Sequence, residues 1–296
     1  MPRPNHTADR PRRAPRAWHD GRVTIDQAKR FDKFASGYAR YWAPVLAPAV
    51  QKLLDELGQA VTPPGRILDV GTGTGQLALG ALSRWPDATV VGVDVSSGMA
   101  KVAEAEAERV LGRAGRKRFS IRIVPADELP FEDGRFDLAI SSFVFQLVPR
   151  RARAFREARR VLRPGGTLAF VTWLQDDRAF RPDQVFDDAL DQLDLEPRAF
   201  DGRPGDLPSV DRTAGELRRA GFAGITAQAG LLEHRFSVDG YVEFLAKFDE
   251  ETLFEELEPD VRRRLESTLR DGLARLTPDE MTMRFPIVFA SGRRSR

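Results

Sequence analysis

The sequence predicts an α/β fold in which helices cover a parallel sheet on both faces. Between residues 65 and 173, short apolar runs alternate with stretches of helical periodicity, a pattern typical of strands buried on both faces. A glycine-rich turn, Gly71 to Gly75, directly follows the first run, and acidic residues close three successive runs. The carboxyl ends of parallel strands meet at one edge of a sheet, so we expect a ligand site there.

Helices are expected before this core. Within residues 24–58, apolar residues such as Phe31, Phe34, Leu53 and Leu57 recur at helical spacing, which predicts amphipathic helices. The sequence Thr-Pro-Pro-Gly at 62–65 ends this segment, because two prolines and a glycine cannot continue a helix.

The core itself is expected to hold five strands with helices between them. The apolar runs predict strands at 66–70, 88–95, 120–127, 136–143 and 167–173. The intervening patterns predict helices at 76–85, at 100–111 with Ser96 or Ser97 as N-cap, and at 149–162, which Arg-Pro-Gly-Gly at 163–166 should end.

Beyond Trp173 the alternation weakens. Residues 174–211 are rich in acids and prolines, a helix is expected at 213–222 and a strand at 223–236, and 238–275 is again helical before a last strand at 281–290. We therefore expect one domain over residues 23–292, with its core at 65–173, a helical lid at 24–58, and inserts at 174–211 and 238–275.

Composition narrows the class of protein. The chain has 296 residues and no cysteine, which excludes disulfides, thiolate metal sites and cysteine nucleophiles. No metal site is expected. No apolar run approaches the ~20 residues of a membrane span, and the N-terminus lacks the apolar region of a signal peptide, so a cytoplasmic location is expected.

Positive charge gathers at the two ends of the chain. The net charge is +2, but residues 1–20 hold five arginines against two aspartates, and residues 293–296 add three arginines. Residues 1–22 are expected to form a disordered basic tail. Such a tail is able to contact nucleic acid, yet no aromatic residues are interleaved with its arginines, so nucleic-acid binding is not expected.

The glycine turn does not match a dinucleotide fingerprint. The third glycine of that pattern would stand at position 76, which is Gln76. Acids at the ends of the first and third strands, Asp69 and Asp127, would also repel a pyrophosphate. They suit a ligand that has cationic groups and hydroxyls, and S-adenosylmethionine offers a sulfonium, an ammonium, a ribose diol and an adenine amine.

Four segments in order resemble class I S-adenosylmethionine-dependent methyltransferases, and most closely the ubiquinone/menaquinone C-methyltransferase branch. They are ILDVGTGTG, VVGVDVSSGM, PADELPFEDGRFDLAISSFVF and RRVLRPGGTLAFVTW, within residues 65–173. The resemblance implies a Rossmann-like, mostly parallel seven-stranded sheet with an antiparallel last strand. It implies S-adenosyl-L-methionine as cofactor, bound by Tyr38, Asp69, Gly71, Thr74, Gly75, Asp94, Val95, Met99, Ala126, Asp127, Glu128 and Ser141.

The resemblance also implies a role for each of these residues. Asp69 and the carbonyl of Ser141 would face the sulfonium or ammonium end, and Thr74 and Gly75 would lie along the cofactor. Asp94 would accept hydrogen bonds from the ribose hydroxyls. Val95 and Met99 would pack on the adenine, Asp127 would accept from its amine, and the backbone of Ala126 or Glu128 would meet a ring nitrogen. Tyr38 would cap the site.

The expected reaction is in-line methyl transfer to a small acceptor, and the many phenylalanines favour an apolar or aromatic one. The aromatic residues that are candidates for lining the acceptor pocket are Phe143, Phe145, Trp173, Phe180, Phe186, Tyr241 and Phe244. The general base is unknown, with His234 as a candidate because it stands in a late strand near the substrate side.

Other activities stay open. Basic tails would suit an RNA or protein methyltransferase, although Ser-Ser-Phe-Val at 141–144 differs from the Asn/Asp-Pro-Pro-aromatic run that often follows the fourth strand of nucleic-acid N-methyltransferases. A non-catalytic protein that binds the cofactor is a further alternative. The acceptor atom (carbon, nitrogen or oxygen) and the oligomeric state are undetermined.

Overall fold

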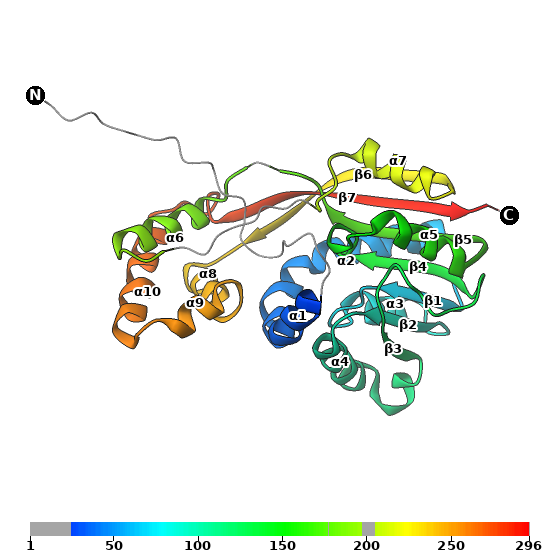
Figure 1. Ribbon diagram of the computed structural model, residues 1–296, viewed down its shortest axis with the longest axis horizontal. Coiled ribbons are helices and arrows are strands. Elements are labelled where there is room, and N and C mark those ends of the chain that lie inside the picture. The colour runs from blue at the N-terminus through cyan, green and yellow to red at the C-terminus, as the bar shows by residue number, and fades with distance from the viewer. Residues whose placement is uncertain (1–24, 177, 197–204, 296) are drawn as a thin grey trace, which may run out of the picture.

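The computed structural model describes residues 25–176, 178–196 and 205–295 (Figure 1). The basic tail expected at 1–22 therefore lies outside the described residues. Within the described chain, one seven-stranded sheet has the order β3-β2-β1-β4-β5-β7-β6. The strands are β1 Arg66–Val70, β2 Thr89–Asp94, β3 Phe119–Ile123, β4 Phe136–Ser142, β5 Leu162–Trp173, β6 Phe222–Arg235 and β7 Thr282–Arg294.

The direction of the strands confirms the expected sheet. Strands β1 to β5 pair in parallel with one another. The last strand, β7, lies between β5 and β6 and is antiparallel to both. The mostly parallel, Rossmann-like sandwich with an antiparallel last strand is therefore correct, and the carboxyl ends of β1 to β5 meet at one edge.

Three strand boundaries differ from the sequence-based expectation by four residues or more, and one of them is the end of β7, at Arg294 rather than 290. Strand β5 begins at Leu162, so the residues expected to end the preceding helix already belong to the strand, because Leu162 is extended and pairs with Phe136. Strand β3 ends at Ile123 rather than 127. Pro125 cannot donate to a ladder, and the segment beyond Ile123 turns toward the edge of the sheet where the ligand is expected.

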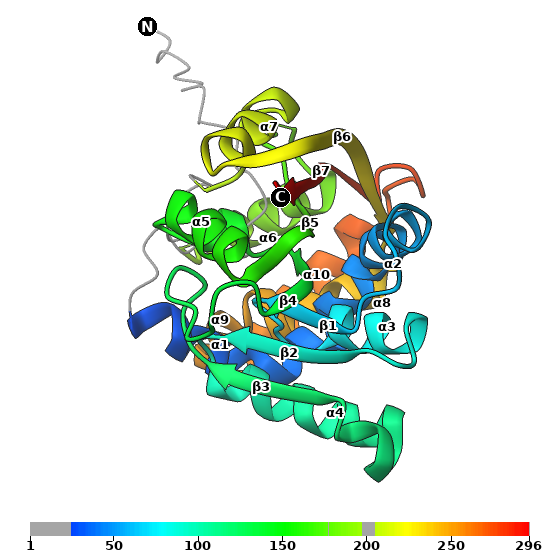
Figure 2. The ribbon, with the colours of Figure 1, turned by 90° about the vertical axis from the view of Figure 1, so that its right-hand side faces the viewer.

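Helices cover both faces of the sheet. Helices α2 (Ala43–Ala60), α3 (Gln76–Arg84) and α4 (Ser97–Arg116) pack on one face, and α5 (Arg151–Val161) and α7 (Val210–Arg219) pack on the other. In Figure 2, α5 and α7 lie on one side of the strands and α2 and α3 on the other. Consecutive residues of β1 serve opposite faces: Ile67 contacts the first core cluster and Leu68 the second.

The two segments expected as a helical lid and insert contact each other. The first comprises α1 (Ile25–Gly37), a π-helical turn at Tyr38–Trp42, and α2. The second comprises α8 (Val238–Phe244), a π-helical turn at Leu245–Asp249, α9 (Glu251–Glu256) and α10 (Pro259–Leu273), which lie with α6 (Arg181–Gln192) at one end of the molecule (Figure 1). Phe248 packs edge-on against Phe34 and Tyr38, each with ring centroids 6.4 Å apart, and Phe244 packs against Trp42 at 5.6 Å.

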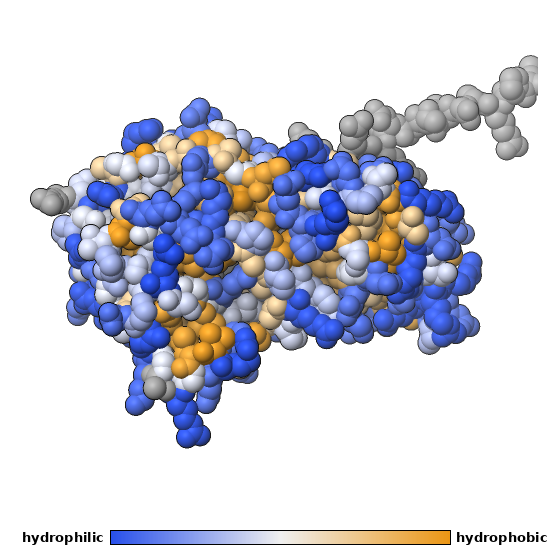
Figure 3. Space-filling model, turned by 180° about the vertical axis from the view of Figure 1, so that it is seen from behind, coloured by the Kyte–Doolittle hydropathy of each residue, from blue (hydrophilic) through white to orange (hydrophobic). Residues whose placement is uncertain are grey.

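The surface is mainly polar. Seen from behind, hydrophilic side chains surround smaller apolar areas (Figure 3). Large hydrophobic residues that are exposed within the described chain are Val110, Ile123 and Leu231. No helix of the described residues combines the length and the apolarity that crossing a membrane requires.

Candidate functional site

The glycine turn after β1 lies against the segment that follows β4. Gly71, Gly73 and Gly75 have φ values of 70°, 53° and 88°, a region that favours glycine. A Cβ on Gly71 would lie 2.3 Å from a methyl of Val144, whereas a Cβ on Gly73 would meet nothing within 4 Å. Gly71 is thus required for close packing, while the backbone at Gly73 is open to a ligand.

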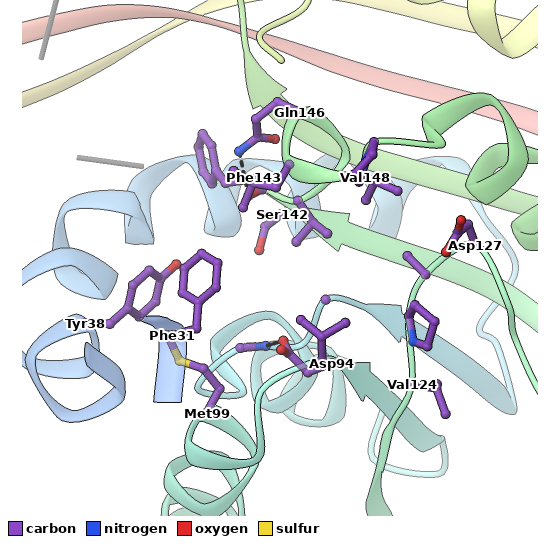
Figure 4. A pocket seen from close by; sticks show the side chains of 18 of the residues that line it. Phe31, Tyr38, Asp94, Met99, Val124, Asp127, Ser142, Phe143, Gln146 and Val148 are labelled. Carbon is purple, nitrogen blue, oxygen red and sulfur yellow. Dashed lines mark hydrogen bonds between the residues drawn. The ribbon is translucent and has the colours of Figure 1, made fainter. Parts of the chain in front are cut away.

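A pocket of about 550 Å³ opens at the carboxyl ends of β1 to β5 (Figure 4). One wall comes from the N-terminal helical segment, through Phe31, Tyr38 and Trp42, and the opposite wall comes from the segments that follow β3 and β4. Figure 4 shows Phe31 and Tyr38 on one side of Asp94, with Asp127 at the other end of the pocket. The N-terminal helical segment therefore covers part of this edge of the sheet.

Seven of the twelve residues expected at the cofactor line this pocket. They are Tyr38, Gly71, Asp94, Val95, Met99, Ala126 and Asp127. The other five are not among the lining residues: Asp69, Thr74, Gly75, Glu128 and Ser141. Of these, Ser141 is buried and its hydroxyl donates to the carbonyl of Val70, so its side chain connects β4 to β1 rather than facing the pocket.

Asp94, the last residue of β2, already accepts two backbone hydrogen bonds. Its Oδ2 accepts from the amide of Gly73 at 2.8 Å, and its Oδ1 accepts from the amide of Ser96 at 2.9 Å. Burial raises the pKa of this carboxyl, and the amides of Ser96 and Gly73 oppose the rise. Each oxygen keeps acceptor capacity toward the pocket, which is the arrangement that a diol would need.

Asp69 lies behind the glycine turn. It is 1% exposed, its Oδ2 accepts from the hydroxyl of Thr72 at 2.8 Å, and its Oδ1 has no hydrogen-bond partner within the described chain. Burial raises the pKa of this carboxyl to about 7, although the bond from Thr72 lowers it. A buried acceptor with an unused oxygen suits a cationic ligand beside the turn.

Asp127 has a partner that the sequence analysis missed. Its side chain is 7% exposed and its Oδ2 lies 2.5 Å from the Nε of Arg150, which also pairs with Glu128 at 3.2 Å. Arg150 precedes α5 and lines the pocket. The guanidinium therefore orients one oxygen of Asp127 at the end of the pocket where the adenine is expected.

The sequence predicted only some of the aromatic residues that line the pocket. Phe143 and Trp173, both named as candidates, line the pocket with ring centroids 4.4 Å apart. The other candidates, Phe145, Phe180, Phe186, Tyr241 and Phe244, are buried outside the lining. Phe31 and Trp42 were missed as lining residues, although the stretch that carries them was singled out as a helix.

Phe143 has a strained backbone at the pocket wall. Its φ of 55° is unusual for an aromatic residue, and such strain clusters at functional sites. Its amide donates to the carbonyl of Val171 at 2.8 Å, and the side-chain amide of Gln146 donates to its carbonyl at 2.7 Å (Figure 4). The hydroxyl of Thr172 in turn donates to Gln146. These bonds hold the Phe143 ring against Trp173.

His234, the candidate base, is not among the residues that line the pocket. It stands on β6 opposite Met283, and its ring packs edge-on against Phe236 at 4.5 Å. Burial lowers its pKa, so it is an uncharged strand residue near neutral pH.

Similarity to known proteins extends over most of the chain. Residues 68–170 match the family model described as a methyltransferase domain. A malonyl-[acyl-carrier protein] O-methyltransferase of Geobacter sulfurreducens is 33% identical over 86% of this chain and 84% of its own length. This chain belongs to the S-adenosylmethionine-dependent methyltransferases. The expected family and cofactor are therefore confirmed.

Other similar proteins match different shares of the methyltransferase. A ubiquinone/menaquinone biosynthesis C-methyltransferase UbiE of Geotalea daltonii is 34% identical over 37% of this chain and 46% of its own length. A Haemonchus contortus phosphoethanolamine N-methyltransferase, solved with S-adenosylhomocysteine, has a TM-score of 0.56 at 20% identity, covering 94% of this chain and 61% of that chain. That likeness shows the fold.

The residues of the methyltransferase fit its cofactor. The open backbone at Gly73 and the carboxyl of Asp94 line the pocket, and the unused Oδ1 of Asp69 lies behind the glycine turn. No group of three metal-binding side chains occurs in the described part of the chain. The sulfonium of the cofactor supplies an activated methyl group, and the protein has to position an acceptor and keep water away.

Proposed function

We propose that the methyltransferase methylates an ionised oxygen of a small acceptor whose body is apolar or aromatic. The residues that line the pocket support this most directly. Phe31, Trp42, Phe143 and Trp173 provide an apolar wall, and the described lining residues include no histidine, lysine or cysteine. An acceptor that carries its own negative charge needs no general base.

The remaining titratable groups in the lining have other partners or unsuitable pKa values. Asp94 accepts from two backbone amides and Asp127 pairs with Arg150. Burial, assisted by the charge of Asp94, raises the pKa of Tyr38 far above neutrality. Tyr38 therefore stays protonated and serves as a hydrogen-bond donor rather than a base.

The aromatic wall orients the acceptor and excludes water from it. Burial of the acceptor against Phe143 and Trp173 removes water from the nucleophilic oxygen and limits its approach to one direction. The strained Phe143, held by Gln146 and Val171, fixes this direction. Displacement then transfers the methyl group in line and needs no covalent bond to the protein.

Two acceptor classes fit this chemistry. The first is the free carboxylate of an acyl thioester. It is favoured because the malonyl-[acyl-carrier protein] O-methyltransferase matches nearly the whole chain, whereas the C-methyltransferase matches little beyond the cofactor-binding core. The second is an acidic phenol, which the aromatic wall favours. A carboxylate is ionised above pH ~4, so ionisation of the acceptor itself should add no pH dependence between about 6 and 9, whereas a phenol would add one.

The test is turnover with S-adenosylmethionine on malonyl thioesters, free dicarboxylic acids, phenols and quinols. Mass spectrometry would detect S-adenosylhomocysteine and the methylated product, and mild base would hydrolyse a methyl ester but not an aryl ether or a C-methyl product. A C-methylated quinol as the preferred product would refute the proposal. Phe143→Ala should lower kcat by at least about tenfold through lost orientation, whereas Phe180→Leu, outside the lining, should not.

A further inference from the structure

A second, strongly basic groove adjoins the pocket. It has a volume of about 720 Å³ and lies between the start of α5 and the end of α7. Its lining includes five arginines and one acid: Arg150, Arg151, Arg153, Arg156, Arg219 and Glu216. Gln146, Val148, Pro149 and Arg150 line both this groove and the pocket, so the two lie side by side and share a wall.

The arginines of the groove divide into two sets. Arg151 is held within the fold, because its Nε and Nη2 contact both oxygens of Glu216 at 2.8 and 3.0 Å and its Nη1 donates to the carbonyl of Gly205 at 2.7 Å. Arg150 is paired with Asp127. Both have structural partners, and the single acid of the groove is neutralised by Arg151.

The second set faces solvent. Arg153, Arg156 and Arg219 are exposed. Arg153 contacts the half-exposed Glu128 at 3.2 Å, and within the described chain no ion pair or side-chain hydrogen bond involves Arg156 or Arg219. These three exposed guanidinium groups surround one opening. Together they produce a positive electrostatic potential that attracts an anionic partner.

We infer that this groove, called here the α5–α7 groove, docks an acidic carrier protein that presents the acceptor covalently on a flexible arm. The inference rests on the acyl thioester acceptor proposed above. Because the groove shares a wall with the pocket, a carrier protein bound on its arginines would place the end of such an arm beside the pocket. A relative that spans nearly the whole chain is named for a substrate carried on an acyl-carrier protein.

The groove suits an acidic protein better than a nucleic acid. Its lining residues include no aromatic side chain, and single-stranded nucleic acids depend on aromatic platforms for base stacking. Arginine-rich surfaces with few apolar residues steer acidic proteins by charge, and they act mainly through the rate of association and the salt dependence.

The test uses Arg153→Glu, Arg156→Glu and Arg219→Glu combined in one variant. Its control combines Arg113→Glu, Lys117→Glu and Arg264→Glu, which reverse three exposed charges away from the groove. Two substrates are compared: a malonyl-loaded acyl-carrier protein, and malonyl N-acetylcysteamine thioester, a small thioester that keeps the malonyl carboxylate but has no carrier protein to contact the groove. Melting temperatures verify that both variants fold.

We expect the groove variant to raise KM for the carrier-borne substrate by about tenfold or more at low salt, with kcat and the small thioester affected less than about twofold. The increase should shrink near 0.5 M NaCl, because salt screens exposed charges at about that ionic strength. The control variant should behave as the wild type. Equal KM values for all three proteins on the carrier-borne substrate would overturn the inference.

Direct binding separates this inference from the proposed acceptor. If the wild type methylates neither thioester but binds the unacylated carrier protein in a salt-sensitive manner that the groove variant loses, the docking surface stands and the proposed acceptor falls. If the wild type methylates the small thioester but does not bind the carrier protein, the inference fails and the proposed function stands. Binding of a short RNA in place of the carrier protein would also refute it.

Discussion

Replacing Asp94 by alanine removes the carboxylate at the end of β2 and so tests its role in cofactor binding. In the folded chain this carboxylate accepts from the amides of Gly73 and Ser96 at 2.8 and 2.9 Å. It therefore holds the glycine turn and the start of α4 in fixed positions beside the pocket. We propose that its remaining acceptor sites bind the two ribose hydroxyls of S-adenosylmethionine.

The expected loss of cofactor affinity follows from the type of hydrogen bond that is removed. Hydrogen bonds to charged groups contribute roughly 1.5–3 kcal/mol, and each 1.4 kcal/mol changes a dissociation constant about tenfold. The loss of one such bond corresponds to roughly tenfold to 150-fold, so Asp94→Ala, which removes the acceptor of both ribose hydroxyls, should weaken S-adenosylmethionine binding by at least roughly tenfold. The amides of Gly73 and Ser96 also lose their acceptor, so some stability is lost as well.

Calorimetric titration of the cofactor measures the affinity, and Asp137→Ala is the matched control. Asp137 also accepts from two backbone amides, those of Gly65 and Arg66 at 2.9 and 2.8 Å, but it stands at the opposite end of the strands, outside the pocket. Both variants should lower the melting temperature, and only Asp94→Ala should weaken binding. Unchanged affinity in folded Asp94→Ala protein would refute the ribose assignment.

Three further predictions use other residues. Burial raises the pKa of Asp69 to about 7, so the folded chain keeps a proton that the unfolded chain loses near pH 4, and stability falls as pH rises between these values. Asp69→Asn should therefore gain up to about 3 kcal/mol relative to wild type between pH 5 and pH 8 in urea unfolding without cofactor. Asp32→Ala removes bonds from the Ser96 hydroxyl and the Gly98 amide, both 2.6 Å. Hydrogen exchange of residues 25–37 should then rise and lose its protection by S-adenosylhomocysteine. His234→Ala should leave kcat within about twofold, and a large loss would return His234 to the site.

The sequence predicted that Asp94 and Asp127 lie at the carboxyl edge of the sheet, because strand ends are local features, whereas Asp69 lies behind the glycine turn and outside the pocket lining. Each of Asp69, Asp94 and Asp127 follows a short apolar run, and parallel pairing brings such ends to one edge whatever the helices do. The sequence also indicated the helical segment before the core. It did not show that Phe31 and Trp42 face the pocket, because periodicity identifies the apolar face of a helix and not what that face contacts.

The positions of Arg150 and His234 relative to the pocket could not be predicted from the sequence. The pairing of Arg150 with Asp127 joins two loops, one after β3 and one after β4, and loop geometry has no periodic signal in the sequence. His234 belongs to β6, which β7 separates from β5 at the edge of the sheet. The order of strands in a sheet decides which residues reach the pocket, and that order depends on tertiary packing.

The N-terminal helical segment and Asp94 meet at one residue, Ser96. The Ser96 amide donates to Asp94, while the Ser96 hydroxyl donates to Asp32 of α1 and accepts from the Met99 amide. A cofactor that tightens Asp94 therefore acts on the same serine that fixes α1, which carries Phe31 into the pocket wall. Coupling of two equilibria is reciprocal, so loosening α1 by Asp32→Ala should also weaken cofactor binding, but by less than Asp94→Ala, because no cofactor contact is removed directly.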